Sequence, residues 1–447
     1  MSMVNCMHTK KAALHSLGCK VNAYETEAMQ QLLEKAGYEI VPFEPGADVY
    51  VINTCTVTNI ADRKSRQMLH RAKKMNPDAI VIATGCYAQI SHDRLTEDAA
   101  VDLVLGNDRK TGLVEAIEEY QKNRQKKEDV IVIAESGSFE PLRIEKTAEH
   151  VRAFIKVCDG CNQFCSYCLI PYARGRVRSR KPEEILEEIR VLAAKGYQEV
   201  VLTGIHLSSY GMDFAKGEKS TLLNLIEAVH QVEGIERIRL GSLEPGIITE
   251  DFVHALSRLD KICPHFHLSL QSGCDRTLER MNRRYRSGDF MEKTQLLRSC
   301  FDDPAITTDI IVGFPQESDE DFQESMDFIE KVRFYETHIF KYSKRDGTRA
   351  ASMEGQIPEA EKTRRSEQLL ALNKKRIREY EERWTGKTLE VLIEESKKIE
   401  GRLCSLGHSR EYIPIALASQ ERVNDRVFVR TTGFLTEHLL LGEKAEK

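Results

Sequence analysis

The sequence lacks any long hydrophobic run. No stretch of 18 or more consecutive apolar residues occurs among its 447 residues, so an ordinary transmembrane helix is not expected. The first twenty residues, MSMVNCMHTKKAALHSLGCK, also lack the apolar segment of a secretory signal. We therefore expect a cytoplasmic protein with no membrane partner.

The chain also lacks a strong excess of charge of either sign, since its net charge is −5. It is 41% hydrophobic and 30% charged, and it is too long for one ordinary core, so two to four domains are expected. Twelve cysteines are present. In a reducing compartment such cysteines are not expected to form disulfides, and clustered ones indicate metal or redox chemistry.

Basic residues are concentrated in a few segments. RKSRQMLHRAKKMNP begins at Arg63, ARGRVRSRK at Ala173, RTLERMNRRYR at Arg276 and KTRRSEQLLALNKKRIREYEER at Lys362. Each segment taken alone is as consistent with a solvated helix face as with a binding surface. Their recurrence favours a polyanionic partner.

The first part of the chain alternates short apolar strands with amphipathic helices. This pattern predicts a doubly wound α/β domain over residues 11–125. The expected strands are 12–17, 48–53, 79–84 and 101–105, and the expected helices are 23–37, 63–75 and 112–122. The polar stretch KNRQKKED, residues 122–129, is interpreted as a domain boundary, with a second linker ending near His150.

The same alternation resumes in the middle of the chain and predicts a partial, parallel (β/α)6 barrel over residues 145–375. The expected strands are 153–157, 198–203, 236–240, 265–270, 305–312 and 335–340, with helices over 181–196 and 221–234. After a basic helix the pattern changes to short strands without helices. Residues 380–442 are therefore predicted to form a small β-barrel.

Three cysteines with C-x3-C-x2-C spacing follow the first strand of the predicted barrel: Cys161, Cys165 and Cys168. Three thiolates suit a 4Fe-4S cluster in which the fourth iron stays open for a substrate. The alternative also uses Cys158 and predicts a structural zinc or a site closed by four thiolates.

A second set of cysteines is spread through the first domain. Cys19, Cys55 and Cys86 each lie just beyond a predicted parallel strand. Such strand ends line one crevice in an open α/β sheet, so the three thiols are expected to converge on one site. The alternative is that they are unrelated buried residues. The other cysteines show no such placement and are interpreted as packing or surface residues: Cys6, Cys263, Cys274, Cys300 and Cys404.

Small and polar residues follow the later barrel strands, where β/α barrels place their active sites. These segments are TGIH from Thr203, GSLEP from Gly241, LQSG from Leu270, GFPQE from Gly313 and YSKRDGT from Tyr342. One such turn is ordinary loop chemistry. Their recurrence at one rim predicts a binding site.

The motif CNQFCSYC resembles the cluster motif of radical S-adenosylmethionine (SAM) enzymes. Together with LGCKVN, NTCTVT, GCYAQ and the C-terminal β module, it resembles the methylthiotransferase family of these enzymes over residues 11–442. The resemblance implies a radical SAM barrel, a second 4Fe-4S cluster on the first-domain cysteines and a C-terminal RNA-binding TRAM domain. It implies SAM as a further cofactor, with a sulfur donor and an external electron donor as partners.

The motif LGCKVN is most similar to the branch that acts on threonylcarbamoyladenosine in the anticodon loop of tRNA. This implies conversion of that nucleoside to its 2-methylthio derivative. Carbon 2 of adenine is not acidic enough for a side-chain base, so a radical route is intelligible. The alternatives are methylthiolation of isopentenyladenosine in tRNA or of a ribosomal protein, and a zinc-stabilised RNA-binding protein without catalysis.

The resemblance also implies residues that bind SAM, and the position of a basic segment indicates residues that bind RNA. The SAM candidates are Tyr167, Thr203, Gly204, His206, Gly313, Phe314 and Pro315, followed by Ser242, Glu244 and Gln271. Four arginines directly after the cluster motif are expected to contact phosphates of the tRNA: Arg174, Arg176, Arg178 and Arg180.

Overall fold

The computed structural model describes residues 9–147, 151–215 and 221–446. The chain forms two compact units. Unit 1 consists of residues up to 148 together with 156–180 and 343–348, and unit 2 consists of 149–155, 181–342 and 349–447. Within the described ranges, no helix combines the length and the apolar character that crossing a bilayer requires.

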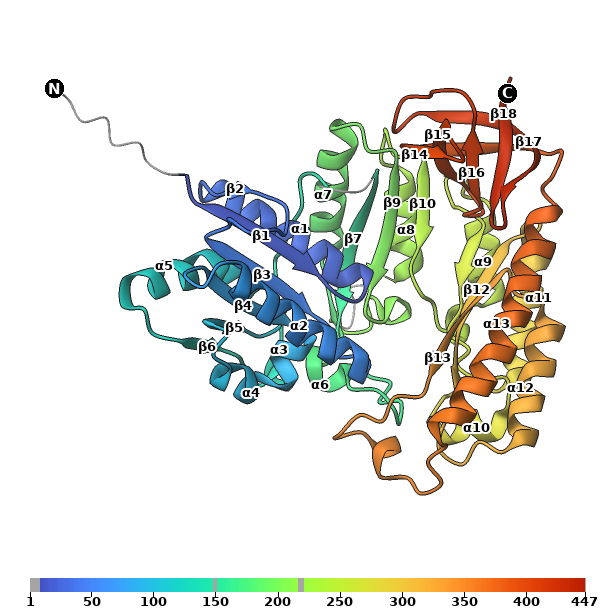
Figure 1. Ribbon diagram of the computed structural model, residues 1–447. Helices are drawn as coiled ribbons and strands as arrows, with labels where there is room; N and C mark the ends of the chain where they lie inside the picture. The colour runs from blue at the N-terminus through green and yellow to red at the C-terminus, as the bar shows by residue number, and fades with distance from the viewer. Residues whose placement is uncertain (1–8, 148–150, 216–220, 447) are drawn as a thin grey trace. The chain divides into compact units, whose positions relative to one another are not determined.

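Unit 1 contains a parallel six-stranded sheet with the order β2-β1-β3-β4-β5-β6 (Figure 1). Its strands are β1 (Lys11–Ser16), β2 (Glu39–Ile40), β3 (Val49–Thr54), β4 (Ile80–Gly85), β5 (Leu103–Leu105) and β6 (Lys127–Asp129). β3 and β4 are buried along their whole length, as their continuous apolar runs predict for strands covered on both faces.

Helices cover both faces of this sheet. They are α1 (Lys20–Lys35), α2 (Asn59–Met75), α3 (Cys86–Ile90), α4 (His92–Glu97) and α5 (Leu113–Asn123). One core packs α1 and α5 against the sheet, and a second core packs α2, α3 and α4 against its other face. The predicted doubly wound α/β fold is confirmed.

The polar stretch after α5 is not a boundary, contrary to the sequence-based interpretation. Residues 127–129 form β6, which pairs in parallel with β5 and extends the sheet. Unit 1 also continues beyond this strand. A three-residue strand with the sequence KED has no apolar pattern that would identify it. The expected linker end near His150 lies outside the described residues, as does Cys6.

The first predicted barrel strand is β7 (Arg152–Asp159), whose residues belong to unit 2 up to 155 and to unit 1 from 156. In unit 1 the end of β7 pairs with β8 (Arg178–Ser179), and α6 (Ile170–Arg174) precedes that strand. The loop that carries Cys161, Cys165 and Cys168 therefore begins at the end of a strand, as predicted.

Unit 2 contains the remaining barrel strands, and all five lie where the sequence predicts them. They are β9 (Glu199–Gly204), β10 (Arg237–Leu240), β11 (His265–His267), β12 (Ala305–Val312) and β13 (Glu336–Lys341). β9 pairs in parallel with β10, and β12 pairs in parallel with both β11 and β13. Parallel bridges from Ile238 to Ile262 and from Leu243 to Leu268 join these two groups.

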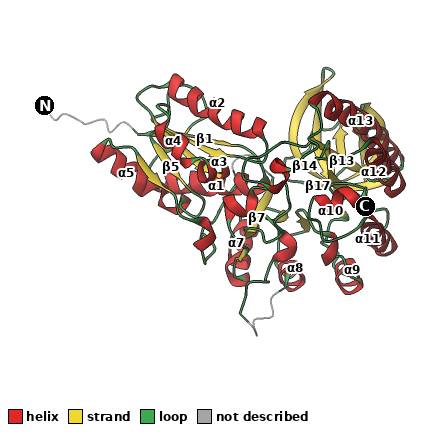
Figure 2. Cartoon of the chain, turned by 90° about the horizontal axis from the view of Figure 1, so that it is seen from below, coloured by secondary structure: helices red, strands yellow, loops and turns green. Residues whose placement is uncertain are grey.

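The helices of unit 2 are α7 (Pro182–Ala194), α8 (Leu222–His230), α9 (Glu250–Ser257), α10 (Asp275–Arg280), α11 (Ser287–Cys300), α12 (Asp319–Val332) and α13 (Glu359–Glu382). Figure 2 shows α11, α12 and α13 outside the strand layer. Local chemistry fixes several starts. Pro182 stands at the beginning of α7, and Thr221 and Ser318 form capping boxes at α8 and α12.

The C-terminal strands form a closed barrel with the order β14-β15-β16-β18-β17, which confirms the predicted small β-barrel. Its strands are β14 (Thr388–Ile399), β15 (Arg402–Ser409), β16 (Pro414–Leu417), β17 (Arg426–Thr436) and β18 (Leu439–Ala445). Arg237 and Arg239 of β10 join it to the rest of unit 2. They donate to the backbone oxygens of Glu390 at 2.7 Å and Arg410 at 3.0 Å.

Candidate functional site

The three cysteines of the first domain follow three adjacent strands of the sheet. Cys19 precedes α1 just after β1, Cys55 directly follows β3, and Cys86 directly follows β4. All three therefore lie at the carboxyl edge of the parallel sheet, beside the point where the strand order reverses between β1 and β3. The sequence predicts this placement, because each thiol comes just after an apolar run.

Close packing at this edge brings the thiols within electrostatic reach of one another. Gly18 has φ +102°, and a Cβ added there would lie 2.9 Å from Cys55 Sγ, so only glycine fits. Cys19 remains exposed at the residue level, yet burial of its thiol raises its pKa, and Cys86 raises it further. Burial raises the pKa of Cys55 to about 11, with smaller contributions from Cys86 and Cys19.

Arg174 connects this cysteine set to the segment after the C-x3-C-x2-C loop. Its Nε donates to Cys86 Sγ at 3.2 Å, and its Nη2 donates to Asn22 Oδ1 at 2.6 Å. Its Nη1 lies 3.1 Å from Asp159 Oδ2 and also donates to Glu25. Arg174 is fully buried, so its charge is balanced by these groups and not by water.

A buried network of charges surrounds Arg174 within unit 1. Lys156 Nζ lies 2.7 Å from Glu25 Oε1, and Lys110 Nζ lies 3.3 Å from Glu25 Oε2. Burial would raise the pKa values of Glu25 and Asp159, but Arg174 and the nearby lysines outweigh it and lower both. Buried charges in such a network hold the chain segments that carry them in one arrangement.

Backbone contacts define the C-x3-C-x2-C loop. Cys161 N–H donates to Gly175 O at 3.1 Å, and Cys168 N–H donates to Cys165 O at 3.0 Å. The N–H groups of Gln163 and Ile170 point at Cys161 Sγ (3.5 Å) and Cys168 Sγ (3.4 Å). Thiolates that accept N–H bonds are typical of iron–sulfur ligands, since these bonds disperse negative charge on sulfur.

Cys158 lies on β7 and not in this loop. It is fully buried and pairs across the sheet with Ser179 of β8. This position on a strand agrees with the interpretation that leaves Cys158 outside the C-x3-C-x2-C set. Of the other cysteines in the described ranges, Cys263, Cys274 and Cys404 are buried, and Cys300 is partly exposed.

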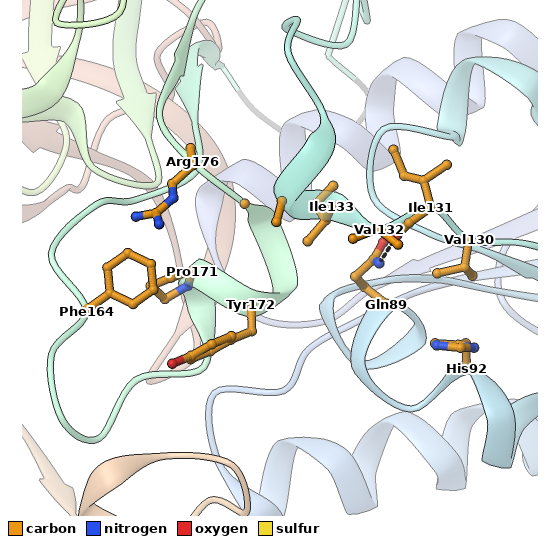
Figure 3. A pocket seen from close by; sticks show the side chains of 12 residues that line it. Gln89, His92, Val130, Ile131, Val132, Ile133, Phe164, Pro171, Tyr172 and Arg176 are labelled. Atoms are coloured by element: carbon orange, nitrogen blue, oxygen red, sulfur yellow. Dashed lines mark hydrogen bonds between the residues drawn. The ribbon is translucent and has the colours of Figure 1, made fainter.

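A pocket of about 480 Å³ lies beside the C-x3-C-x2-C loop, entirely within unit 1 (Figure 3). Phe164, Tyr172 and Arg176 line one side, and the segment Val130–Ala134 lines another. The Arg176 guanidinium lies 4.4 Å from the centre of the Phe164 ring, and Tyr172 is 51% exposed. The pocket therefore offers exposed aromatic surface next to a cation.

The structure corrects the expectation for three of the four arginines after the cluster motif. Arg174, Arg178 and Arg180 are buried and therefore are not placed to contact phosphates. Arg178 pairs with Asp108 at 2.9 Å, and Arg180 lies 3.4 Å from the Tyr24 hydroxyl. Only Arg176 of these four is exposed. Charge spacing in a sequence does not reveal acidic partners that lie far along the chain, such as Asp108, 70 residues before Arg178.

Two of the candidates for SAM binding lie together in unit 2. His206 follows β9, and its Nε2 is 3.7 Å from Glu244 Oε1 after β10. Arg283 pairs with the same carboxylate, and its guanidinium lies 5.0 Å from the centre of the Tyr285 ring. These interactions with His206 and Arg283 lower the pKa of Glu244 although burial opposes them. Arg283 and Tyr285 were not predicted, because they lie in a basic segment without a motif.

The remaining candidates of unit 2 lie near other strand ends. Gly313 has φ +70°, and its N–H donates to Glu317 Oε1 at 2.9 Å. Phe314 is buried against Tyr342, with ring centres 5.3 Å apart. Gln271 has φ +72° and bridges to Ile310 on β12. Thr203 and Pro315 are buried, Gly204 is partly buried, and Ser242 is exposed. Tyr167, in unit 1, is partly exposed.

The segment 343–348, which follows the last barrel strand, belongs to unit 1. Arg345 Nη2 lies 2.6 Å from Asp62 Oδ2 and donates to Thr56 Oγ1 at 2.8 Å. Asn59 Nδ2 donates to Lys344 O at 3.0 Å. This segment is therefore fixed against the loop directly after Cys55. The sequence marks YSKRDGT as a polar rim segment but does not identify this partner.

The chain is similar to known protein families and to individual proteins from bacteria. Residues 11–106 match the family model described as uncharacterized protein family UPF0004, and residues 155–329 match the radical SAM superfamily. The threonylcarbamoyladenosine tRNA methylthiotransferase MtaB of Bacillus subtilis is 42% identical over 92% of this chain and 90% of its own length. The Aquifex aeolicus protein of the same name is 43% identical over 87% and 94%.

A second kind of relative is similar to a lesser degree. The tRNA-2-methylthio-N(6)-dimethylallyladenosine synthase of Thermoanaerobacter sp. is 37% identical over 88% of this chain and 84% of its own length. Among solved structures, the radical SAM methyltransferase TsrM of Kitasatospora setae has a TM-score of 0.57 at 15% identity, covering 77% of each chain. That likeness concerns the fold alone.

Proposed function

Because this chain belongs to the family of radical SAM tRNA methylthiotransferases, we propose that it attaches a methylthio group to carbon 2 of threonylcarbamoyladenosine in the anticodon loop of tRNA. The observation that carries the proposal is the presence of two three-cysteine sets within one compact unit: Cys19, Cys55 and Cys86 at adjacent strand ends, and Cys161, Cys165 and Cys168 in one loop. The high identity to the MtaB proteins supports the choice of nucleoside.

The cofactors of this family are two 4Fe-4S clusters and SAM. We assign one cluster to Cys161, Cys165 and Cys168, and the other to Cys19, Cys55 and Cys86. The donor sets suit this chemistry, since three thiolates leave one iron open for a further ligand. When bound, these groups supply the radical and the sulfur chemistry that no side-chain acid or base provides at carbon 2 of adenine.

The chain's own residues hold the two cysteine sets in place. Arg174 donates to Cys86 and pairs with Asp159, which ends β7 before the C-x3-C-x2-C loop begins. It therefore fixes both loops to one buried network. Arg345 in turn anchors the loop after Cys55 through Thr56 and Asp62. Their role is to position the thiols.

We further propose that the strand-end residues at the barrel rim bind SAM. The candidates are Tyr167, Thr203, Gly204, His206, Ser242, Glu244, Gln271, Gly313, Phe314 and Pro315. Glu244, paired with His206 and Arg283, offers a carboxylate of lowered pKa, which suits a cationic group. The Gly313 backbone permits close approach of a ligand because a positive φ there favours glycine.

The pocket in Figure 3 supports a contact with RNA. Tyr172 and Phe164 offer aromatic surface, and Arg176 offers an exposed cation beside it. Unpaired bases of RNA loops bind to such aromatic and guanidinium surfaces. We propose that this pocket contacts the anticodon loop.

We also propose that an electron donor and a sulfur donor act with the enzyme. The reaction is proposed to take place in the cytoplasm.

Changing Arg176 to Ala is expected to weaken tRNA binding and to reduce the slope of log K against log salt by about one unit, because one phosphate contact is lost. Binding isotherms at several salt concentrations measure this slope. Arg176→Lys is the matched control, since it keeps the charge and should keep the slope. An unchanged slope for Arg176→Ala would assign the residue to packing against Phe164 only.

The nucleoside is tested by incubating the reconstituted enzyme anaerobically with SAM, a reductant and two tRNA pools. One pool carries threonylcarbamoyladenosine, and the other carries isopentenyladenosine. Nucleoside mass spectrometry is expected to detect the 2-methylthio product in the first pool only. Product in the second pool alone would place this chain with the dimethylallyladenosine synthases, to which it is also similar.

A further inference from the structure

Two histidines and one aspartate gather on three adjacent strands of unit 2. His267 ends β11, Asp309 lies on β12 and His338 lies on β13. One ligand atom from each lies within 4.8 Å of the other two. The register places Asp309 directly opposite His338, and it pairs His267 with Thr307, two residues before Asp309. Parallel pairing therefore brings the three side chains onto one face.

This face is the one turned away from α13. The Thr337 side-chain hydroxyl donates to Asn373 Oδ1 of α13 at 3.0 Å, so the Thr337 side chain lies on the helix-covered side of β13. Side chains alternate along a strand, so His338 points to the opposite side. His338 is 44% exposed, and Asp309 is 30% exposed. Asp309 and His338 are thus accessible to a ligand from solution.

The hydrogen bond of His267 orients its ring toward Asp309. Nδ1 lies 2.9 Å from Thr307 Oγ1, and Nε2 lies 3.4 Å from Asp309 Oδ2. When Nδ1–H donates to the threonine, the neutral ring presents a lone pair to a carboxylate that also carries lone pairs. With this tautomer, a metal ion between the two atoms makes their approach favourable, whereas with the other tautomer Nε2–H donates to Asp309 Oδ2.

The geometry suits a metal ion. Two ligand atoms bound tetrahedrally at about 2.1 Å from a metal lie about 3.4 Å apart, which matches the separation of His267 Nε2 from Asp309 Oδ2. A histidine ligand that engages an oxygen through its second ring nitrogen is the usual arrangement in metal sites, and Thr307 provides that oxygen. The ring centre of His338 lies 5.6 Å from that of His267, and one ring nitrogen of His338 lies within 4.8 Å of the other two ligand atoms, where it can supply the third donor.

Two other groups of potential ligands are less suitable. In Cys274, Asp321 and Glu324, the Asp321 carboxylate is already paired with Arg276 and Arg280. In His92, Asp93 and Glu128, Asp93 is 89% exposed. Both groups are therefore less suited to bind a metal ion than His267, Asp309 and His338.

We propose that His267, Asp309 and His338 bind one divalent transition-metal ion of the zinc type, separate from both cysteine sets. Three protein ligands of this kind leave a coordination position open, as in catalytic zinc sites. That position accepts water or an oxygen ligand such as a carboxylate. Asp309 lies three residues before the end of β12, and His338 lies three residues before the end of β13. The open position is therefore near the carboxyl ends of the strands, where β/α barrels place their active sites.

The test uses the full-length enzyme with its clusters reconstituted. The protein is equilibrated anaerobically with Zn²⁺ and then dialysed, and its zinc is measured by mass spectrometry and by X-ray absorption at the zinc edge. About one zinc per chain is expected, with nitrogen and oxygen neighbours at about 2.0–2.1 Å and no sulfur shell at about 2.3 Å. Zinc bound with sulfur neighbours would place the ion on the cysteines and overturn the proposal.

Variants identify the ligands. Asp309→Asn and His338→Gln are each expected to reduce bound zinc to background, with iron content and visible spectrum unchanged as a check on folding. His92→Gln in unit 1 and His254→Gln on α9 of unit 2 are the matched controls and should retain the zinc, because neither histidine belongs to this group of ligands. Equal zinc in all four variants, or no zinc in the unchanged protein, would overturn the metal site and leave a hydrogen bond from His267 Nε2–H as the explanation of its contact with Asp309.

Discussion

A variant in which Cys19, Cys55 and Cys86 are all changed to Ala is expected to cleave SAM reductively while forming no 2-methylthio nucleoside. These thiols lie at the edge of the N-terminal sheet, whereas the C-x3-C-x2-C loop remains intact in this variant. Iron should fall to about four atoms per chain, which corresponds to the loss of one cluster. Assays for 5′-deoxyadenosine and nucleoside mass spectrometry measure both activities in one incubation.

The matched variant changes Cys161, Cys165 and Cys168 to Ala and is expected to lose SAM cleavage and product together. It should also retain about four iron atoms per chain. The two variants thus remove the same number of thiols from the same compact unit. Normal product from the first variant would mean that Cys19, Cys55 and Cys86 are structural, and cleavage by the second would refute the assignment of the radical cluster. Cys158→Ala should leave both activities intact.

Arg174→Met is expected to be the most destabilising single substitution proposed here. Methionine replaces only the aliphatic part of the arginine side chain and leaves Glu25 and Asp159 as buried carboxylates without their central partner. Breaking a buried ion pair in this way costs about 3–5 kcal/mol. Thermal and denaturant unfolding, monitored with the iron content, measure the loss. Arg71→Met, at an exposed position of α2, is the control and should change stability by less than about 0.5 kcal/mol.

The same network predicts a dependence on pH. Pairing lowers the pKa values of Glu25 and Asp159 in the folded chain. Their contribution to stability is therefore present above their unfolded pKa values and is lost as the pH falls through the lowered folded values. Arg174→Met should weaken this acid-side dependence. If Arg174→Met is as stable as Arg71→Met at neutral pH and loses stability at low pH as the unchanged protein does, the network does not depend on Arg174.

The sequence by itself determined the longer strands and helices and the positions of the two cysteine sets. Apolar runs such as VYVINT and IVIATG produce buried parallel strands, and a thiol directly after such a run must lie at the carboxyl edge of the sheet. Alternation of strand and helix likewise predicted β9 to β13, because each strand carries its own hydrophobic pattern. The strand β6 was missed because KED is polar and is defined only by its pairing with β5.

Only the tertiary structure decided which charged residues are available to a partner. Arg174 and Arg176 stand two residues apart in one basic segment, yet the first is buried against Glu25 and the second is exposed beside Phe164. Likewise, the convergence of His267, Asp309 and His338 depends on the register of three strands. The local sequence carries the hydrophobic periodicity that determines strands and helices. The partner of a buried charge is fixed by contacts between distant segments, and these exist only after the chain has folded.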